Sequence, residues 1–342
     1  MSRNYDILFV SEAAIGNTLE MLYALEYCLV NGVNAAICLK KINRSFEVYL
    51  KRCYGENAVL SSLDGVRTTN LVHPFIVEER MDIPYRNYFY IHPDAASTRY
   101  QSETEQYLSV ARALYPSDYH SDRLTMLQAD LTDRVRALEL ENKYVFYPGC
   151  SSFASAKRWP YFRELAEALG DDKVIFVGGS DDLNYESSYS YRPWVGKLLP
   201  YRLTNRKSVW QLCKKLKLLR PYAHNTGIEE QENSYFNVFD WGELVAIFKG
   251  AKGFVGNDGG LMHLAAAAGA KGVAIFGPSS VEKNRAYSPS MEAVHTDYDC
   301  QPCQFSVKNV FMARNYIACP YDMKCLKDIA PGNVIDRLGN GQ

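Results

Sequence analysis

A glycine-rich turn in the second half of the chain carries the residue types best suited to holding a phosphate. The chain reads GNDGG from Gly256 to Gly260, directly after an apolar stretch that predicts a strand over Gly253–Val255. Glycines at a helix start let the backbone approach a bound group, and the first helical amides have no partner inside the helix. That end also carries the positive pole of the helix dipole. The turn is typical of a phosphate or pyrophosphate site, and close helix packing is the alternative explanation for its small residues.

The elements around this turn are those of an α/β sheet. Small apolar residues predict a helix from about Leu261 to Ala268, and a second strand is expected over Gly272–Phe276. Asp258 therefore stands at the carboxyl end of a strand, where open α/β sheets bind their ligands. We expect a site for an anion or a sugar nucleotide there.

Strand and helix signals alternate along the first half of the chain. The predicted strands are Asp6–Val10, Ala35–Leu39, Thr69–Val72 and Tyr88–Ile91, and the predicted helices are Leu19–Leu29, Phe46–Cys53, Glu103–Leu114 and Asp122–Leu138. Such alternation indicates a parallel, doubly wound sheet.

The pattern restarts near Tyr144, which predicts a second domain. A strand over Tyr144–Tyr147, a helix over Tyr161–Leu169 and a strand over Val174–Val177 follow one another. We expect an α/β protein of two Rossmann-like domains, residues 1–142 and 143–342, facing each other across a cleft. Neither half contains G-x-G-x-x-G or the Walker A pattern, which argues against a dehydrogenase or a P-loop enzyme.

Composition points to a globular protein of the cytoplasm. The 342 residues are 47% hydrophobic and 23% charged, with a net charge of −1, so the overall balance does not favour nucleic acid as a partner. Apolar runs fall short of the roughly 20 residues needed to span a bilayer, and the start of the chain lacks a signal-peptide pattern. Nine cysteines, an odd number, argue against a disulfide framework.

Three blocks of the second half resemble glycosyltransferase family 9, the ADP-heptose heptosyltransferases of lipopolysaccharide assembly, which have a two-domain GT-B fold. The blocks are PGCSSFASAKRWPYFRELAEAL (Pro148–Leu169), GNDGGLMHLAAAAGAKGVAIFGPSS (Gly256–Ser280) and the cysteine-rich stretch Cys300–Ile335. The first half is similar mainly through its first strand and the Ile15-Gly16-Asn17 turn.

The resemblance implies roles for the first block in binding the donor. Lys157 would neutralise the leaving diphosphate, and a solvated surface lysine is the alternative. The hydroxyls of Ser151 and Ser152 would donate to the same phosphates. Trp159 and Pro160 are expected to pack the start of the next helix.

The second block would bind the sugar and the phosphates. By the resemblance, Asp258 hydrogen-bonds the sugar hydroxyls while the amides of Gly259, Gly260 and Leu261 face the phosphates. His263, one turn into the helix, would lie near the phosphates, and a purely structural histidine is the alternative.

The resemblance implies an inverting transfer of heptose from ADP-heptose to a hydroxyl of a bacterial glycan, such as the lipopolysaccharide core. The lysine and the helix dipole would take the leaving charge without a divalent metal. The pair Asp181-Asp182 is more typical of a loop than of a metal site. Serine hydroxyls of a protein are an alternative acceptor, and a non-catalytic relative that binds sugar nucleotide is an alternative function.

The position of the general base departs from the family pattern. Lipopolysaccharide heptosyltransferases commonly have Gly-Asp in the first turn, whereas this chain has Gly16-Asn17, and asparagine accepts no proton at neutral pH. Glu12 and Glu20 are the nearby carboxylates. We favour Glu20 because a residue three positions on lies on the same helix face, and a solvated glutamate in the first helical turn is the alternative.

Four cysteines near the C-terminus have the spacing C-x2-C-x15-C-x5-C. Two close pairs, Cys300 with Cys303 and Cys319 with Cys325, predict a structural four-thiolate site for zinc or iron. Free or buried thiols are the alternative.

A basic segment runs from Arg192 to Arg220 with nine basic residues and no acidic ones. It is typical of a solvated face. The alternative is a peripheral contact with anionic glycolipid at the inner membrane, for which Trp210 and Leu218 would be suited.

Overall fold

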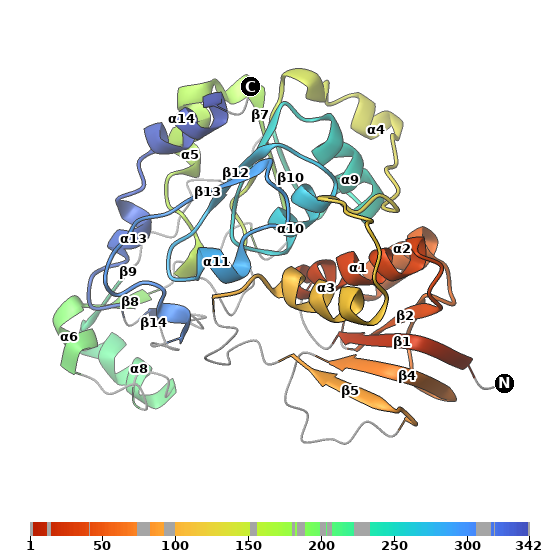
Figure 1. Ribbon diagram of the computed structural model, residues 1–342. Helices are drawn as coiled ribbons and strands as arrows, with labels where there is room; N and C mark the ends of the chain where they lie inside the picture. Colours follow the sequence, from red (N-terminus) through yellow and green to blue (C-terminus); the bar gives the residue numbers. More distant parts are fainter. Residues whose placement is uncertain are drawn as a thin grey trace.

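A computed structural model describes the protein over residues 3–11, 15–40, 42–73, 83–91, 100–150, 156–179, 182, 189–198, 203, 207–221, 233–305, 316–317 and 319–340. Two parallel sheets with their helices form two domains, and a third, smaller sheet forms a lobe beside the second domain (Figure 1). The α/β class and the two parallel-sheet domains predicted from the sequence are confirmed. The division at residue 142 stays a prediction.

The first domain has a five-stranded parallel sheet in the order β3-β2-β1-β4-β5. Its strands are β1 (Arg3–Ser11), β2 (Ala35–Leu39), β3 (Val59–Leu60), β4 (Val66–His73) and β5 (Asn87–Tyr90), and its helices are α1 (Ile15–Val30), α2 (Arg44–Tyr54) and α3 (Glu103–Leu114). All three helices lie on the face of the sheet toward the second domain (Figure 1). The buried cluster on the opposite face contains strand and loop residues and none from the described helices.

The second domain has a six-stranded parallel sheet in the order β10-β7-β6-β11-β12-β13. Its strands are β6 (Tyr144–Tyr147), β7 (Val174–Gly178), β10 (Ser234–Phe236), β11 (Gly253–Asn257), β12 (Gly272–Ile275) and β13 (Met291–Val294). Helices α9 (Trp241–Gly250) and α10 (Gly260–Ala267) cover one face, and α5 (Phe162–Leu169) and α14 (Pro331–Asn340) cover the other. This order, with helices on both faces, is that of a doubly wound Rossmann sheet.

The lobe was not foreseen from the sequence. Its sheet has the order β14-β8-β9, with β8 (Tyr189–Tyr191), β9 (Leu219–Pro221) and β14 (Tyr316–Ile317). Helices α6 (Pro193–Leu198) and α8 (Lys207–Lys215) accompany it, and the short helices α11 (Val281–Asn284) and α13 (Lys324–Lys327) belong to the neighbouring second domain. The lobe has its own small buried cluster, made of Val195, Cys213 and Leu219.

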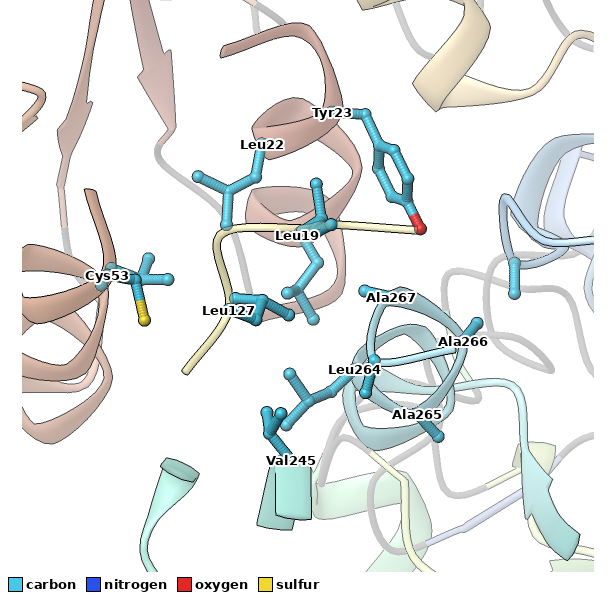
Figure 2. Close-up of a cluster of buried hydrophobic side chains, with 14 of the residues drawn as sticks. Leu19, Leu22, Tyr23, Cys53, Leu127, Val245, Leu264, Ala265, Ala266 and Ala267 are labelled. Atoms are coloured by element: carbon cyan, nitrogen blue, oxygen red, sulfur yellow. The ribbon is translucent and has the colours of Figure 1, made fainter. Parts of the chain in front are cut away.

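The two domains share one hydrophobic core. Helix α1 of the first domain packs on α10 of the second, and Figure 2 shows Leu19 and Leu22 facing Leu264 with Leu127 and Val245 beside them. The alanine side chains of α10 are short, so the two helices approach closely. An apolar contact of this kind fixes the relative position of the domains. None of the described helices is long and apolar enough to cross a membrane.

The helix predicted over Asp122–Leu138 is wrong for most of its length, since only α4 (Asp133–Arg136) forms there. The residues before α4 run between the domains and find partners in both. The Leu124 amide donates to the Ala267 carbonyl at 2.9 Å, and the amide and hydroxyl of Thr125 each donate to Glu26 at 2.6 Å. Tertiary partners for these backbone groups replace the bonds that a helix would have made.

Glu26 is the main anchor of this crossing segment. Its buried carboxylate also accepts from the Tyr54 hydroxyl at 3.0 Å. We predict that Glu26→Gln lowers the free energy of unfolding by about 2–3 kcal/mol, because an amide cannot accept all these hydrogen bonds and leaves donors unpaired. Exposed Glu56→Gln is the matched control and should change it by less than about 0.5 kcal/mol. Denaturant titration measures both, and equal stability of the two variants would contradict the assignment.

Candidate active site

The strand-order reversals of the two large sheets face each other. The order reverses between β1 and β4 in the first sheet and between β6 and β11 in the second, and ligands of open α/β sheets bind at such points. Helices α1 and α10 start there, and their first turns touch. A Cβ placed on Gly16 would lie 3.1 Å from Cδ2 of His263, and one on Gly260 would lie 3.3 Å from Cβ of Ile15. The candidate site is therefore shared between the domains.

Asp258 directly follows β11. It pairs with Lys157, which lies between β6 and α5. The Lys157 ammonium donates to Oδ2 of Asp258 at 2.7 Å, and the Asn284 amide donates to the same oxygen at 3.2 Å. Burial on its own would raise the pKa of Asp258, but the charge and hydrogen bond of Lys157 outweigh burial and hold that pKa below its usual value. Asp258 is thus a carboxylate at neutral pH. The structure thus places Lys157 and Asp258, which sequence analysis assigned to one donor site, in direct contact.

Asn257 fixes the loop that carries Lys157. Its side-chain amide donates to the carbonyls of Pro148 at 2.7 Å and Gly149 at 3.1 Å, and its Oδ1 accepts from the Trp159 amide at 2.9 Å. Asn257 is fully buried, so these bonds compete with no water. Asn257 thus holds residues at both ends of this loop. Sequence analysis missed this positioning role. Trp159 is fully buried, in agreement with the packing role predicted for it.

His263 is a buried, neutral imidazole in this structure. Its pKa is lowered to about 4, mainly by burial, because the nearby Asp258 carboxylate offsets burial only in part and the Lys157 charge also lowers the pKa. The ring packs against Gly16 of the other domain. At neutral pH it can offer a hydrogen bond to a ligand but no positive charge.

A pair of buried glutamates faces this group from the first domain. Glu20 of α1 and Glu103, the first residue of α3, share a side-chain hydrogen bond. The Asn17 amide donates to Oε2 of Glu103 at 2.7 Å. Burial, then the charge and hydrogen bond of Glu103, raise the pKa of Glu20 well above its usual value, and Asp258 adds to the effect. Glu20 therefore holds a proton more readily than an ordinary glutamate does.

A lysine from the second domain completes the arrangement. Lys283 of α11 is buried, and its ammonium lies 3.9 Å from Oε1 of Glu103. We call the whole set the interdomain polar cluster: Asn17, Glu20, Glu103, Lys157, Asp258, His263, Lys283 and Asn284. With Glu20 protonated and His263 neutral, two carboxylates face two ammonium groups. Such balance lets charges persist in a buried site.

Three buried hydroxyls close to Glu103 in the chain lack a hydrogen-bond partner among the described residues. They belong to Ser102, Thr104 and Tyr107. A buried polar group without a partner costs about 1–3 kcal/mol, so these hydroxyls are expected to bind water or a ligand.

Not every predicted site residue can be placed. Glu12, Ser151, Ser152 and Asp181 lie outside the described residues. Gly259 is the extended N-cap residue of α10 and offers no side-chain cap, and Gly260 and Leu261 begin that helix against α1. Asp182 is a buried partner of Arg158, with 2.7 Å between Oδ1 and the guanidinium, and so has a structural role rather than that of a plain loop residue.

The four C-terminal cysteines gather around one buried cluster. Cys303, Cys319 and Cys325 belong to the same hydrophobic core, and burial raises the pKa of each of these thiols. Neighbouring cysteines, Cys300 included, raise the pKa of Cys325 further, so all four lie near one another. Soft thiol donors so placed suit zinc or iron. Within the residues that the structure describes, however, no three His, Cys, Asp or Glu side chains stand in a metal-binding arrangement.

An open groove of about 480 Å³ lies beside the cluster, lined by residues of both domains. Ser102 and Glu105 of the α3 start line it, with Arg285 and Tyr287 opposite. Glu103 and Glu105 are two positions apart on a helix and project to nearly opposite sides. The groove thus reaches the edge of the cluster at Ser102, next to Glu103, whereas Asp258 and Lys157 do not line it.

The fold and site define a class of protein. Two parallel-sheet domains that meet at an interdomain site form the GT-B fold of glycosyltransferases. The solved E. coli ADP-heptose LPS heptosyltransferase II is similar, with a TM-score of 0.57, 98% of each chain covered and 16% identity. The iron-containing heptosyltransferase TibC of enterotoxigenic E. coli, solved with ADP-D-beta-D-heptose, gives a TM-score of 0.56 at 14% identity and covers 99% of this chain and 77% of its own. At these identities the likeness shows the fold alone.

Sequence similarity narrows this class to one family. The family model of glycosyltransferase family 9 (heptosyltransferase) matches residues 70–194 and 226–311. The lipooligosaccharide heptosyltransferase 2 of Campylobacter jejuni subsp. jejuni serotype O:2 is 35% identical over 200 residues, which are 56% of this chain and 49% of that protein. The chain belongs to glycosyltransferase family 9, and it spans about half the length of the curated relative it matches.

Proposed function

We propose that the protein is an inverting glycosyltransferase that moves heptose from ADP-heptose to a hydroxyl of a bacterial glycan, such as the lipopolysaccharide core. The observation that carries this proposal is the buried Lys157–Asp258 pair at the strand-order reversal of the second sheet, facing the glutamate pair of the first domain. Membership of family 9 and relatives named as heptosyltransferases support the sugar and the acceptor class. We place the reaction at the cytoplasmic face of the inner membrane.

The second domain would bind the donor. Lys157 leaves Asp258 to contact the diphosphate, where its charge stabilises the leaving group, and the uncapped start of α10 adds the amides of Gly259, Gly260 and Leu261. Asp258, released from Lys157, accepts hydrogen bonds from the sugar hydroxyls. Two ammonium groups and a helix start suffice for the leaving charge, so the chemistry needs no divalent metal.

The first domain would bind the acceptor and take its proton. We assign the proton acceptor to Glu103 rather than to Glu20, because Glu20 already carries a proton. Glu20 and Asn17 both donate to the Glu103 carboxylate and orient it. The unpartnered hydroxyls of Ser102 and Tyr107 would receive the acceptor sugar. When the acceptor oxygen attacks the anomeric carbon, its proton passes to Glu103 and the bond to the diphosphate breaks.

We predict that purified protein transfers heptose from ADP-heptose to a lipopolysaccharide core acceptor, and that Lys157→Ala and Asp258→Ala lose this activity. Removing a preorganised group that stabilises the transition state lowers kcat by about 10²- to 10³-fold. Exposed Lys173→Ala is the control and should keep wild-type activity. Wild-type turnover by the folded Lys157 or Asp258 variant would overturn that residue's role. Transfer to protein serines instead would replace the acceptor, and donor binding without transfer would favour a non-catalytic relative.

The different roles proposed for Glu103 and Glu20 predict different effects of their substitution. Glu103→Gln should lower kcat by about 10²- to 10⁴-fold, because it removes the general base. Glu20→Gln should cost less than about tenfold, because its amide can still donate to Glu103. Wild-type activity should fall at alkaline pH, where Glu20 loses its proton and a second anion appears beside Glu103, and Glu20→Gln should remove that fall.

A rescue variant tests where the proton goes. Asn17→Asp, introduced into Glu103→Gln, should restore part of the rate, because it places a carboxylate one hydrogen bond away from position 103. Pre-steady-state rates across pH measure these effects. A severe loss in Glu20→Gln with a mild one in Glu103→Gln would reverse the assignment.

We further propose that Cys300, Cys303, Cys319 and Cys325 hold one structural zinc or iron ion. The nearness of the four thiols supports this. Elemental analysis after purification without metal-affinity resin should find about one equivalent per chain, as in four-thiolate sites generally. Cys303→Ser should lose the metal, and Cys213→Ser, which removes a buried thiol of the lobe, should keep it. Four free thiols in metal-free, folded protein would refute the site.

A further inference from the structure

The lobe exposes an unusual number of large apolar side chains. Four of the five exposed leucines in the described part of the chain lie there: Leu198, Leu203, Leu212 and Leu216. Trp194 of α6 is also more than half exposed, and Leu198 is 72% exposed. Leucines left in water in such density on a separate lobe indicate a contact surface.

These side chains form two short stripes on neighbouring helices. Trp194 and Leu198 are four residues apart on α6, and Leu212 and Leu216 are four apart at the end of α8, where the Leu216 amide still donates to the Leu212 carbonyl at 2.9 Å. The residue that follows the first member of each pair, Val195 after Trp194 and Cys213 after Leu212, is buried, and the two join the helices within the lobe. Among the described residues, the helices thus pack through these buried side chains while Trp194, Leu198, Leu212 and Leu216 stay exposed. In Figure 1 they form the outer end of the lobe.

The segment that carries the stripes is rich in basic residues. The segment from Arg192 to Arg220 has nine basic residues and no acidic ones, although the whole chain has a net charge of −1. The side chains of Lys214, Lys215 and Lys217 are exposed, and the Lys214 ammonium lies 5.2 Å from the centroid of the Trp210 ring. Exposed lysines therefore lie next to Leu212 and Leu216 at the end of α8.

We propose that the outer face of α6 and α8 docks on a lipid bilayer whose surface carries anionic headgroups. Leucine and tryptophan side chains would enter the boundary between headgroups and acyl chains, while the lysines would contact lipid phosphates. The proposal goes beyond the transferase function and depends on neither its donor nor its acceptor.

Other occupants fit these observations less well. A second copy of the same face in a twofold dimer would bring two basic surfaces together without acidic partners. Single-stranded nucleic acid is bound mainly by basic grooves with aromatic stacking platforms, whereas the outer faces here carry mostly aliphatic leucines. A bilayer uses both the charge and the aliphatic side chains.

The lobe is anchored to the cysteine-rich segment. Strand β14 pairs with β8 through Tyr316 and Tyr189, and β14 lies between Cys303 and Cys319 in the chain. The buried thiols therefore lie at both ends of the segment that supplies the edge strand of the lobe. This attachment would hold α6 and α8 in a fixed orientation to the second domain.

Vesicle flotation of the full-length protein tests the proposal. At about 0.15 M salt, wild-type protein should float with phosphatidylethanolamine–phosphatidylglycerol vesicles and not with phosphatidylcholine vesicles, because the contact needs anionic headgroups. Replacing Lys214, Lys215 and Lys217 together with Gln should weaken partitioning on the order of 10²-fold. Replacing Leu198, Leu212 and Leu216 together with Ser should weaken it at least about tenfold.

The controls separate docking from folding. Leu131→Ser, at an exposed leucine outside the lobe, should partition like the wild type, and thermal unfolding of all variants should match the wild type because the replaced side chains are exposed. Failure of wild-type protein to float, or equal flotation with both vesicle types, would overturn the proposal. So would self-association or oligonucleotide binding that the same leucine and lysine variants abolish while vesicle binding is absent.

Discussion

The close contact between helices α1 and α10 is the constraint on which the rest of the structure depends. Alanines on α10 and glycines at the start of both helices let the two domains meet with almost no space between their backbones. Because each helix begins at the strand-order reversal of its own sheet, this apolar contact brings the two ligand-binding edges together. The crossing segment anchored by Glu26 then follows the same interface.

The same contact buries charged groups of both domains. Glu103 of the first domain lies beside Lys283 of the second, and Asp258 pairs with Lys157 within the second domain. A diphosphate that enters this cluster would bring negative charge, which Lys157 and the amides at the start of α10 would offset while the sugar hydroxyls donate to the released Asp258 carboxylate. The proposed transfer uses that exchange, with the second domain holding the donor and the first holding the base.

Much of the fold could be predicted because local patterns agree with the tertiary structure. The strand Ala35–Leu39 and the helix Glu103–Leu114 have the bounds expected from hydrophobic periodicity. The helix over Asp122–Leu138 could not be ruled out locally, because its amides find partners on α1 and α10. Lys157 and Asp258 could be found by motif, whereas Glu103 has the sequence signal of any acidic residue in a first helical turn. Its burial depends on α1 and α11, which no local pattern reveals.

Hydrogen exchange with and without ADP-heptose tests most directly whether one ligand site is shared by both domains. We expect the donor to slow exchange at residues 256–263 of the second domain and also at residues 15–20 of the first, because the two helix starts are in contact. Protection that is confined to the second domain, or that leaves residues 256–263 unchanged, would contradict a shared site.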